Sequence, residues 1–150
     1  MVRRESGVRP GIGGLIRPSR CPTPRTTREE IEMAGNGGQG SKWIRRERRL
    51  AIYLRDRFEC AYCGRDLRDA RRDEVTLDHL IPRSEFGTND TTNLVTACHA
   101  CNVTRQDRPW REFATGGAVQ RIEWLVTQPI NRDLARAILA GHTPMVEAMR

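Results

Sequence analysis

The sequence predicts an α+β fold, in which a small core of two strands and a helix is stapled by a four-cysteine metal site and flanked by further helices. Two Cys-x-x-Cys pairs, Cys60/Cys63 and Cys98/Cys101, are the first observation. The second is a pair of short segments between them with the alternation and β-branching of strands. The third is the helical period of apolar residues outside the pairs. At 150 residues, the chain has the length of one domain.

Three segments are predicted along the chain. Residues 1–41 form a mostly disordered arm, because this stretch of Gly, Pro and Arg has too little apolar material to offset the entropy lost on ordering. Thr27 begins a capping-box pattern that predicts one short helix in the arm, and Cys21 is expected to be a surface thiol. Residues 42–114 are the predicted functional domain, and residues 115–150 a helical extension.

The functional domain begins with a predicted basic amphipathic helix over residues 42–55. Its apolar residues share one face at helical spacing, namely Trp43, Leu50 and Leu54. Its arginines gather on another face, namely Arg45, Arg48 and Arg49. On charge alone, a phosphate-contacting face and a solvated helix surface fit this pattern equally well. The rest of the sequence favours DNA as the partner of these arginines.

A strand, a second strand and a helix are predicted next. Residues 75–81 alternate and are β-branched, and Pro82 ends this run. Residues 93–97 form the second short strand, and a helix is expected to start at residues 102–106, just past the second cysteine pair. Successive side chains of a strand point to opposite faces, so Asp78 and His79 can share one pocket only if the backbone bends between them.

Two helices are predicted in the C-terminal extension. Apolar residues recur with helical period from Ala118 to Val126, and Pro129 ends that run. Asn131 is the expected N-cap of the second helix and Gly141 its terminator. Both helices are expected to supply core, and so are three aromatic residues, Trp110, Phe113 and Trp124.

The cysteine spacing predicts a structural zinc site. A two-residue gap lets one tight turn present two thiolates, and one tetrahedral zinc takes four such ligands. A disulfide framework is the main competitor, but the chain has five cysteines and its first residues lack the apolar core of a secretory signal. A thioredoxin-like redox site would need one pair, not two matched pairs. We therefore expect a reducing compartment, the cytoplasm.

The charge balance favours a polyanionic partner. Lys and Arg number 26 against 19 Asp and Glu, which gives a net charge of +7. Such an excess favours nucleic acid only modestly, because it can also serve solubility. No apolar run has the length needed to span a bilayer, so no membrane partner is expected.

The residues in and between the cysteine pairs resemble the HNH endonuclease family, in its branch with paired zinc knuckles. The resemblance covers about residues 55–113. It rests on four motifs, Cys60-x-x-Cys63-Gly64, Leu77-Asp78-His79-Leu80-Ile81-Pro82, Asn93-Leu94-Val95 and Cys98-His99-Ala100-Cys101-Asn102-x-x-Arg105. It implies the ββα-metal fold and cleavage of phosphodiester bonds in DNA.

The resemblance also implies a role for each matching residue. His79 stands where the family has the general base that takes a proton from the attacking water, a task that suits a neutral imidazole. Asp78 and Asn102 stand where the family holds a catalytic divalent cation, expected to be Mg²⁺ or Mn²⁺. Asn93 matches the residue that orients the base through the loop, and Arg105 matches a phosphate contact.

Three functions fit the sequence. The first is a metal-dependent DNA endonuclease, which the joint occurrence of Asp78, His79 and Asn102 favours. The second is a non-catalytic, zinc-stabilised DNA-binding module, which would have the same basic helix and cysteines. The third is a degenerate HNH domain that serves as an interaction scaffold. The sequence has no helix-turn-helix or tandem finger that would predict a preferred DNA sequence, and it predicts no oligomeric state.

Overall fold

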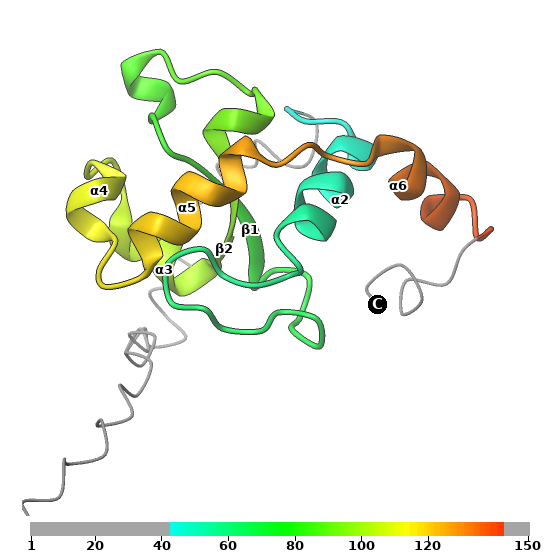
Figure 1. Ribbon diagram of the computed structural model, residues 1–150, viewed down its shortest axis with the longest axis horizontal. Helices are drawn as coiled ribbons and strands as arrows, with labels where there is room; N and C mark the ends of the chain where they lie inside the picture. The colour runs from blue at the N-terminus through cyan, green and yellow to red at the C-terminus, as the bar shows by residue number, and fades with distance from the viewer. Residues whose placement is uncertain (1–42, 143–150) are drawn as a thin grey trace, which may run out of the picture.

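A two-stranded antiparallel sheet lies at the centre of the fold (Figure 1). The computed structural model describes residues 43–142, in which β1 spans Val75–His79 and β2 spans Leu94–Cys98. The register pairs Val75 with Cys98 and His79 with Leu94. Every residue of β2 is buried, because helices cover both faces of this strand. The sheet carries three of the candidate site residues, Asp78 and His79 in β1 and Cys98 in β2.

The described helices follow the predicted order. They are α2 Arg46–Arg55, α3 His99–Arg105, α4 Trp110–Phe113, α5 Ala118–Thr127 and α6 Arg132–Leu139, with 3-10 turns η1 Arg83–Glu85 and η2 Thr91–Asn93 in the loop between the strands. The predicted strand, strand and helix are therefore confirmed as β1, β2 and α3. Among residues 43–142, no helix combines the length and the apolar character needed to cross a membrane.

The two faces of the sheet belong to two hydrophobic clusters. On one face, Leu77 of β1 and Leu94 of β2 pack with Ile52 of α2. On the other face, Val95 and Ala97 of β2 pack with the cysteine turns and with α5. Because strand side chains alternate between faces, this division puts neighbouring residues of β1 in different surroundings.

Helix α2 is shorter than the sequence predicts, because it begins at Arg46 and not at Lys42. The carbonyl of Trp43 accepts a hydrogen bond from the loop residue Asn89, which holds Trp43 ahead of the helix. The predicted apolar face of Trp43, Leu50 and Leu54 is also wrong in detail. The helix buries Ala51 and Ile52, while Leu50 and Leu54 are half-buried, because α2 packs against both the sheet and α6.

A buried ion pair fixes the end of α2 to β2. Arg55 contacts the carboxylate of Asp56 at 2.6 Å and donates to the carbonyl of Leu94 at 2.7 Å. The same carboxylate accepts from the backbone N–H of Thr96 at 2.7 Å. Such a pair is tolerated in a core because its polar atoms are hydrogen-bonded.

The C-terminal helices lie where the sequence predicts, and α5 has its predicted place in the core, while α6 buries only Ala135. Helix α5 buries Ile122 and Leu125, and α6 is capped by the Asn131 side chain, which accepts from Leu134 N at 2.9 Å. Trp110 and Phe113 are half-buried and pack against the larger cluster, as predicted. Trp124 does not, because its side of α5 faces solvent and 53% of it is exposed.

Several predictions fall outside the described residues. These are the disordered arm of residues 1–41, the short helix at Thr27 and the surface thiol at Cys21. The predicted boundary between residues 42–114 and residues 115–150 stays a prediction.

Candidate active site and metal centre

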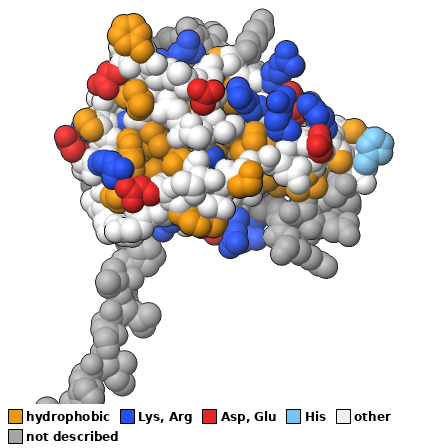
Figure 2. Space-filling model, turned by 45° about the horizontal axis from the view of Figure 1, so that its top comes forward, with side chains coloured by type: hydrophobic (Ala, Val, Ile, Leu, Met, Phe, Trp, Pro, Cys, Tyr) orange, Lys and Arg blue, Asp and Glu red, His pale blue; other side chains and the backbone are white. Residues whose placement is uncertain are grey.

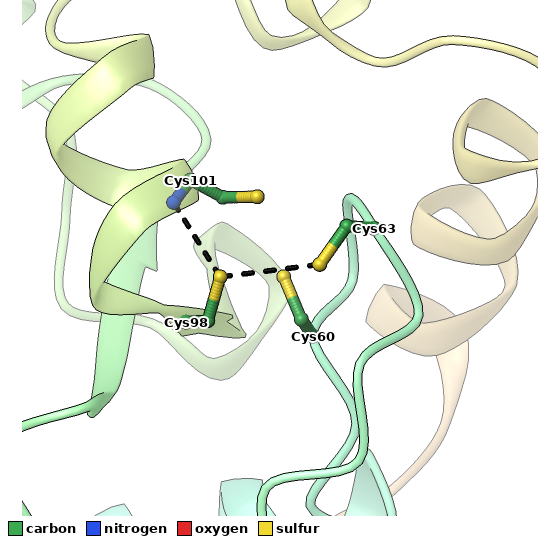
Figure 3. Close-up of side chains that lie close together, drawn as sticks. All are labelled: Cys60, Cys63, Cys98 and Cys101. Atoms are coloured by element: carbon green, nitrogen blue, oxygen red, sulfur yellow. Dashed lines mark hydrogen bonds between the residues drawn. The ribbon is translucent and has the colours of Figure 1, made fainter. Parts of the chain in front are cut away.

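The four paired cysteines meet at one point, as the sequence predicts (Figure 3). Cys60 and Cys63 lie in a turn before β1, Cys98 ends β2, and Cys101 lies in the first turn of α3. Their four Sγ atoms lie within 4.8 Å of one another, and those of Cys63 and Cys98 are 3.9 Å apart. A tetrahedral zinc with Zn–S bonds of about 2.3 Å needs sulfurs about 3.8 Å apart, so this cluster fits the ion.

Backbone geometry presents the thiols to the centre of the cluster. Gly64 adopts a left-handed conformation with φ of 71° and donates to the carbonyl of Cys60 at 2.8 Å, which closes the first turn. The Sγ of Cys98 accepts from the backbone N–H of Cys101 at 3.4 Å and so caps α3. The first turn and α3 are therefore held on either side of the same site.

The thiols share protons in a way that favours metal binding. Hydrogen bonds from Cys101 lower the pKa of Cys63 and of Cys98 to about 6, and that of Cys60 to about 7. The hydrogen bond with Cys60 raises the pKa of Cys101, which keeps its proton. Thiolate is the form that binds metal, so three of the four ligands are prepared for it.

Asn93 ties together the loop that follows β1. Its Oδ1 accepts from the backbone N–H of Ile81 at 2.8 Å, while its Nδ2 donates to the carbonyls of Ile81 and Thr88 at 3.1 Å and 2.9 Å. The amide is buried, so its bonds form in a water-poor setting. Asn93 therefore closes the loop between Ile81 and Thr88, and its role in orienting the base through this loop stays a prediction.

His79 ends β1 between an aromatic ring and an amide. The Trp43 ring lies 4.8 Å from the imidazole, centroid to centroid, with 35° between the planes. The imidazole Nε2 lies 2.9 Å from Oδ1 of Asn89, whose Nδ2 donates to the carbonyl of Trp43 at 3.2 Å. That second bond orients the amide so that its oxygen faces the ring. An amide oxygen only accepts, so in the neutral ring this contact places the hydrogen on Nε2 and leaves Nδ1 as the acceptor nitrogen.

Asp78 points away from His79, into the core. Its Oδ2 accepts from Nε of Arg105 at 2.7 Å and from the hydroxyl of Tyr62, and its Oδ1 accepts from Nη2 of Arg105 at 2.9 Å. Burial and the charge of Asp78 raise the pKa of Tyr62, so its hydroxyl remains a donor. Arg105 is buried too, and it also donates to the carbonyls of His79 and Arg108.

The strand is regular through this pair, which corrects the expected bend. His79 is still in register with Leu94, and the bend begins at Leu80. Asn102 lies on the Asp78 face of β1, since its Nδ2 donates to Oγ1 of Thr76 at 3.0 Å. The structure thus brings together Asp78, Asn102 and Arg105 on one face, with His79 on the other.

The donor set around Asp78 does not fit a divalent cation in this arrangement. Both carboxylate oxygens are engaged, and a cation beside them would meet the guanidinium of Arg105. Among the described residues, the four cysteines are the one group of three or more Cys, His, Asp or Glu side chains close enough to hold a metal.

The predicted DNA-contacting arginines differ in exposure. Arg45 is exposed at the N-terminus of α2, while Arg48 and Arg49 are half-buried, with the Arg49 guanidinium 5.3 Å from the centre of the Trp43 ring. Figure 2 shows Lys and Arg side chains gathered on the surface near α2 and α6. Arg105 differs because it lies in the core, and its role as a phosphate contact stays a prediction.

Four residues of this region were not predicted from sequence. Asn89 lies in the loop between the predicted strands, and Trp43 was predicted on the apolar face of a helix, yet both contact the ring of His79. Tyr62 lies between Cys60 and Cys63, and the spacing of these cysteines gives no indication of its contact with Asp78. Arg132 lies outside the resemblance and reaches Glu47 of α2 at 3.2 Å. A polar residue ten positions after a candidate base gives no local signal of contact.

Comparison with known proteins agrees with the geometry. The model of the family described as HNH endonuclease matches residues 60–108. A relative, the CRISPR-associated endonuclease Cas9 of Corynebacterium diphtheriae, is 27% identical over 95 residues, which are 63% of this chain and 8% of that protein. The chain thus spans a small part of the length of this relative. No solved structure matches the chain.

Proposed function

We propose that the protein hydrolyses phosphodiester bonds in DNA, because residues 60–108 match the model of the HNH endonuclease family. The observation that carries the proposal is the state of His79. Asn89 binds its Nε2, and within the described residues no hydrogen bond is made to its Nδ1. A neutral imidazole with a basic nitrogen left open is what a general base requires.

In the proposed reaction, Nδ1 of His79 takes a proton from a water molecule. The water oxygen bonds to phosphorus, and the bond from phosphorus to a sugar oxygen breaks. Asn89 keeps the proton on Nε2 throughout, which leaves Nδ1 as the nitrogen that can accept another. Asn93 holds the loop on which Asn89 lies. A base in such a position contributes about 10²–10⁴-fold to the rate.

Substrate binding is assigned to the arginines near the start of α2. Arg45, Arg48 and Arg49 would contact phosphates, as the sequence predicts. Arg45 and Arg48 line one cavity with Trp43, the Arg49 guanidinium lies over the Trp43 ring, and that ring packs on His79. Phosphate contacts of this kind release counterions, so affinity should fall steeply with salt.

A catalytic cation, Mg²⁺ or Mn²⁺, would supply charge stabilisation at the phosphoryl oxygens when bound. Asp78 and Asn102 stay its proposed ligands, but the observed pairing of Asp78 with Arg105 does not accommodate it. No step is therefore assigned to these two residues.

Cleavage of supercoiled plasmid tests the proposal. We expect nicking or linearisation that depends on Mg²⁺ or Mn²⁺ and is lost in His79→Ala, with zinc content and DNA affinity close to wild type. His142→Ala is the matched control, because His142 is an exposed histidine at the end of the described fold. Equal cleavage by both variants would remove His79 as the base.

The second candidate is the non-catalytic, zinc-stabilised DNA-binding module. The engagement of Asp78 by Arg105 and Tyr62 favours it, because that pairing leaves no open oxygen for a catalytic cation. This candidate predicts salt-dependent DNA binding by zinc-loaded protein with no cleavage in any divalent cation.

A further inference from the structure

A cavity of about 490 Å³ lies among α2, α6 and the loop before η2. Three of its six lining residues are arginines and none is acidic: Trp43, Ile44, Arg45, Arg48, Asn89 and Arg132. We infer that this cavity seats a phosphate of the DNA backbone beside His79, and that α6 supplies Arg132 to the seat. The inference rests on the proposed function and extends the substrate-binding surface from α2 to α6.

The cavity shares two of its walls with His79. The Trp43 ring packs on the imidazole, and Asn89 binds its Nε2. Both residues also line the cavity. An anion in the cavity is therefore next to the two side chains that set the position of the base, and a DNA strand that places one phosphate there runs past His79.

Arg48, which lines the cavity, carries an unsatisfied donor. Its Nε is buried, and residues 43–142 offer it no hydrogen-bond partner, as is also true of the Nε of Arg49. Buried donors are almost always paired, so this N–H calls for an acceptor that the protein does not supply. A phosphate oxygen is such an acceptor.

The start of α2 adds to the attraction for an anion. Arg45 is the N-cap of this ten-residue helix, and no side chain caps it. The N–H groups of the first turn and the helix dipole therefore favour negative charge near the cavity. This feature supports the seat defined by the arginines and Arg48 Nε.

Arg132 comes from the far end of the described chain. It lies in the first turn of α6, and its guanidinium is 3.2 Å from the carboxylate of Glu47, with 42% of its side chain exposed. Glu47 holds the guanidinium on the α2 side, and the exposed donors remain able to bind phosphate in the two-pronged geometry that suits arginine.

Three variants of the full chain test the inference through DNA binding in a salt series without added Mg²⁺. Arg132→Ala removes the phosphate contact. Glu47→Gln breaks the same ion pair but keeps Arg132. Arg111→Ala removes an exposed arginine that is ion-paired with Glu123 at 2.6 Å, on α4 at the other end of the molecule (Figure 1).

The expected result separates phosphate binding from packing. Arg132→Ala should weaken binding to every duplex and lower the salt slope by about 1. Glu47→Gln should bind at least as tightly as wild type, and Arg111→Ala should keep the wild-type slope. A wild-type slope for Arg132→Ala overturns the inference. So does an equal loss in Arg132→Ala and Glu47→Gln, which would make the ion pair structural.

Titration with inorganic phosphate distinguishes this inference from the nuclease proposal. We expect NMR shifts at the Trp43 indole and the Asn89 amide of wild type that Arg132→Ala reduces. If the protein shows these shifts but never cuts DNA, the phosphate site is supported and the nuclease proposal is refuted. A chain that cuts DNA, with no phosphate shift at either residue and no effect of Arg132→Ala, keeps the nuclease and loses the seat.

Discussion

Arg105 binds Asp78 through two hydrogen bonds, of 2.7 Å and 2.9 Å. His79, the residue after Asp78, lies on the opposite face of the same strand. The pair is buried, with 1% of the Arg105 side chain and 5% of the Asp78 side chain exposed. The residue expected to hold a catalytic cation is thus held by a cation of the protein itself.

Asp78→Ala should destabilise the fold by about 3–5 kcal/mol, because it leaves the buried guanidinium of Arg105 unpaired. Urea unfolding measures the change. The double variant Asp78→Leu with Arg105→Met should recover most of the loss, since it removes both charges. If the single variant unfolds like wild type, the pair contributes little.

The same prediction governs how an Asp78 variant is read in a cleavage assay. Loss of activity in Asp78→Ala alone does not identify a cation ligand, because the variant also unbalances the core. An Asp78 variant with wild-type unfolding and no cleavage would support the ligand role.

Asn89→Asp should shift the rising limb of the cleavage pH profile to higher pH. A carboxylate facing Nε2 stabilises the imidazolium, so the neutral base becomes available only at higher pH. Asn89→Ala should lower the rate without that upward shift. Identical pH profiles for wild type and Asn89→Asp would show that Asn89 does not act on the base.

Asn93→Ala should lower the free energy of unfolding by about 1–3 kcal/mol or more. The substitution leaves the backbone groups of Ile81 and Thr88 without the hydrogen-bond partner that the Asn93 amide supplies. Thermal unfolding gives the stability, and cleavage well below the melting temperature gives the effect on the site. Thr92→Ala is the control, since this neighbour is exposed. A variant as stable and as active as wild type would contradict the loop-tying role.

Removal of zinc should unfold the domain and not merely inactivate it. The ion would join a turn before β1 to the start of α3, and structural zinc sites contribute folding energy of this kind. We expect one zinc per chain, lost with the circular dichroism signal on chelation, and Cys98→Ser to behave like the chelated protein. Cys21→Ser should keep the full zinc content. A chelated protein with the native spectrum would show that the cysteines are dispensable for folding.

Local signals explain what the sequence predicted. The zinc cluster follows from two fixed spacings, β1 and β2 from alternation, and α5 and α6 from period, Pro129 and the Asn131 cap. These features depend on residues close together in the chain, so each is readable alone.

Contacts between distant segments explain what the sequence did not predict. The residues next to Asp78 in the sequence do not indicate that Arg105 binds it. Those next to His79 do not indicate its contacts with Trp43 and Asn89. The start of α2 was misplaced for the same reason, since a bond from Asn89 holds Trp43 out of the helix. The proposed catalytic roles depend on these distant contacts.

The contact between Glu47 and Arg132 brings the first helix of the described fold against the last. A unit whose entry and exit helices adjoin can be spliced into a surface loop of a larger protein without pulling that loop apart. The described fold is therefore suited to insertion into a larger protein.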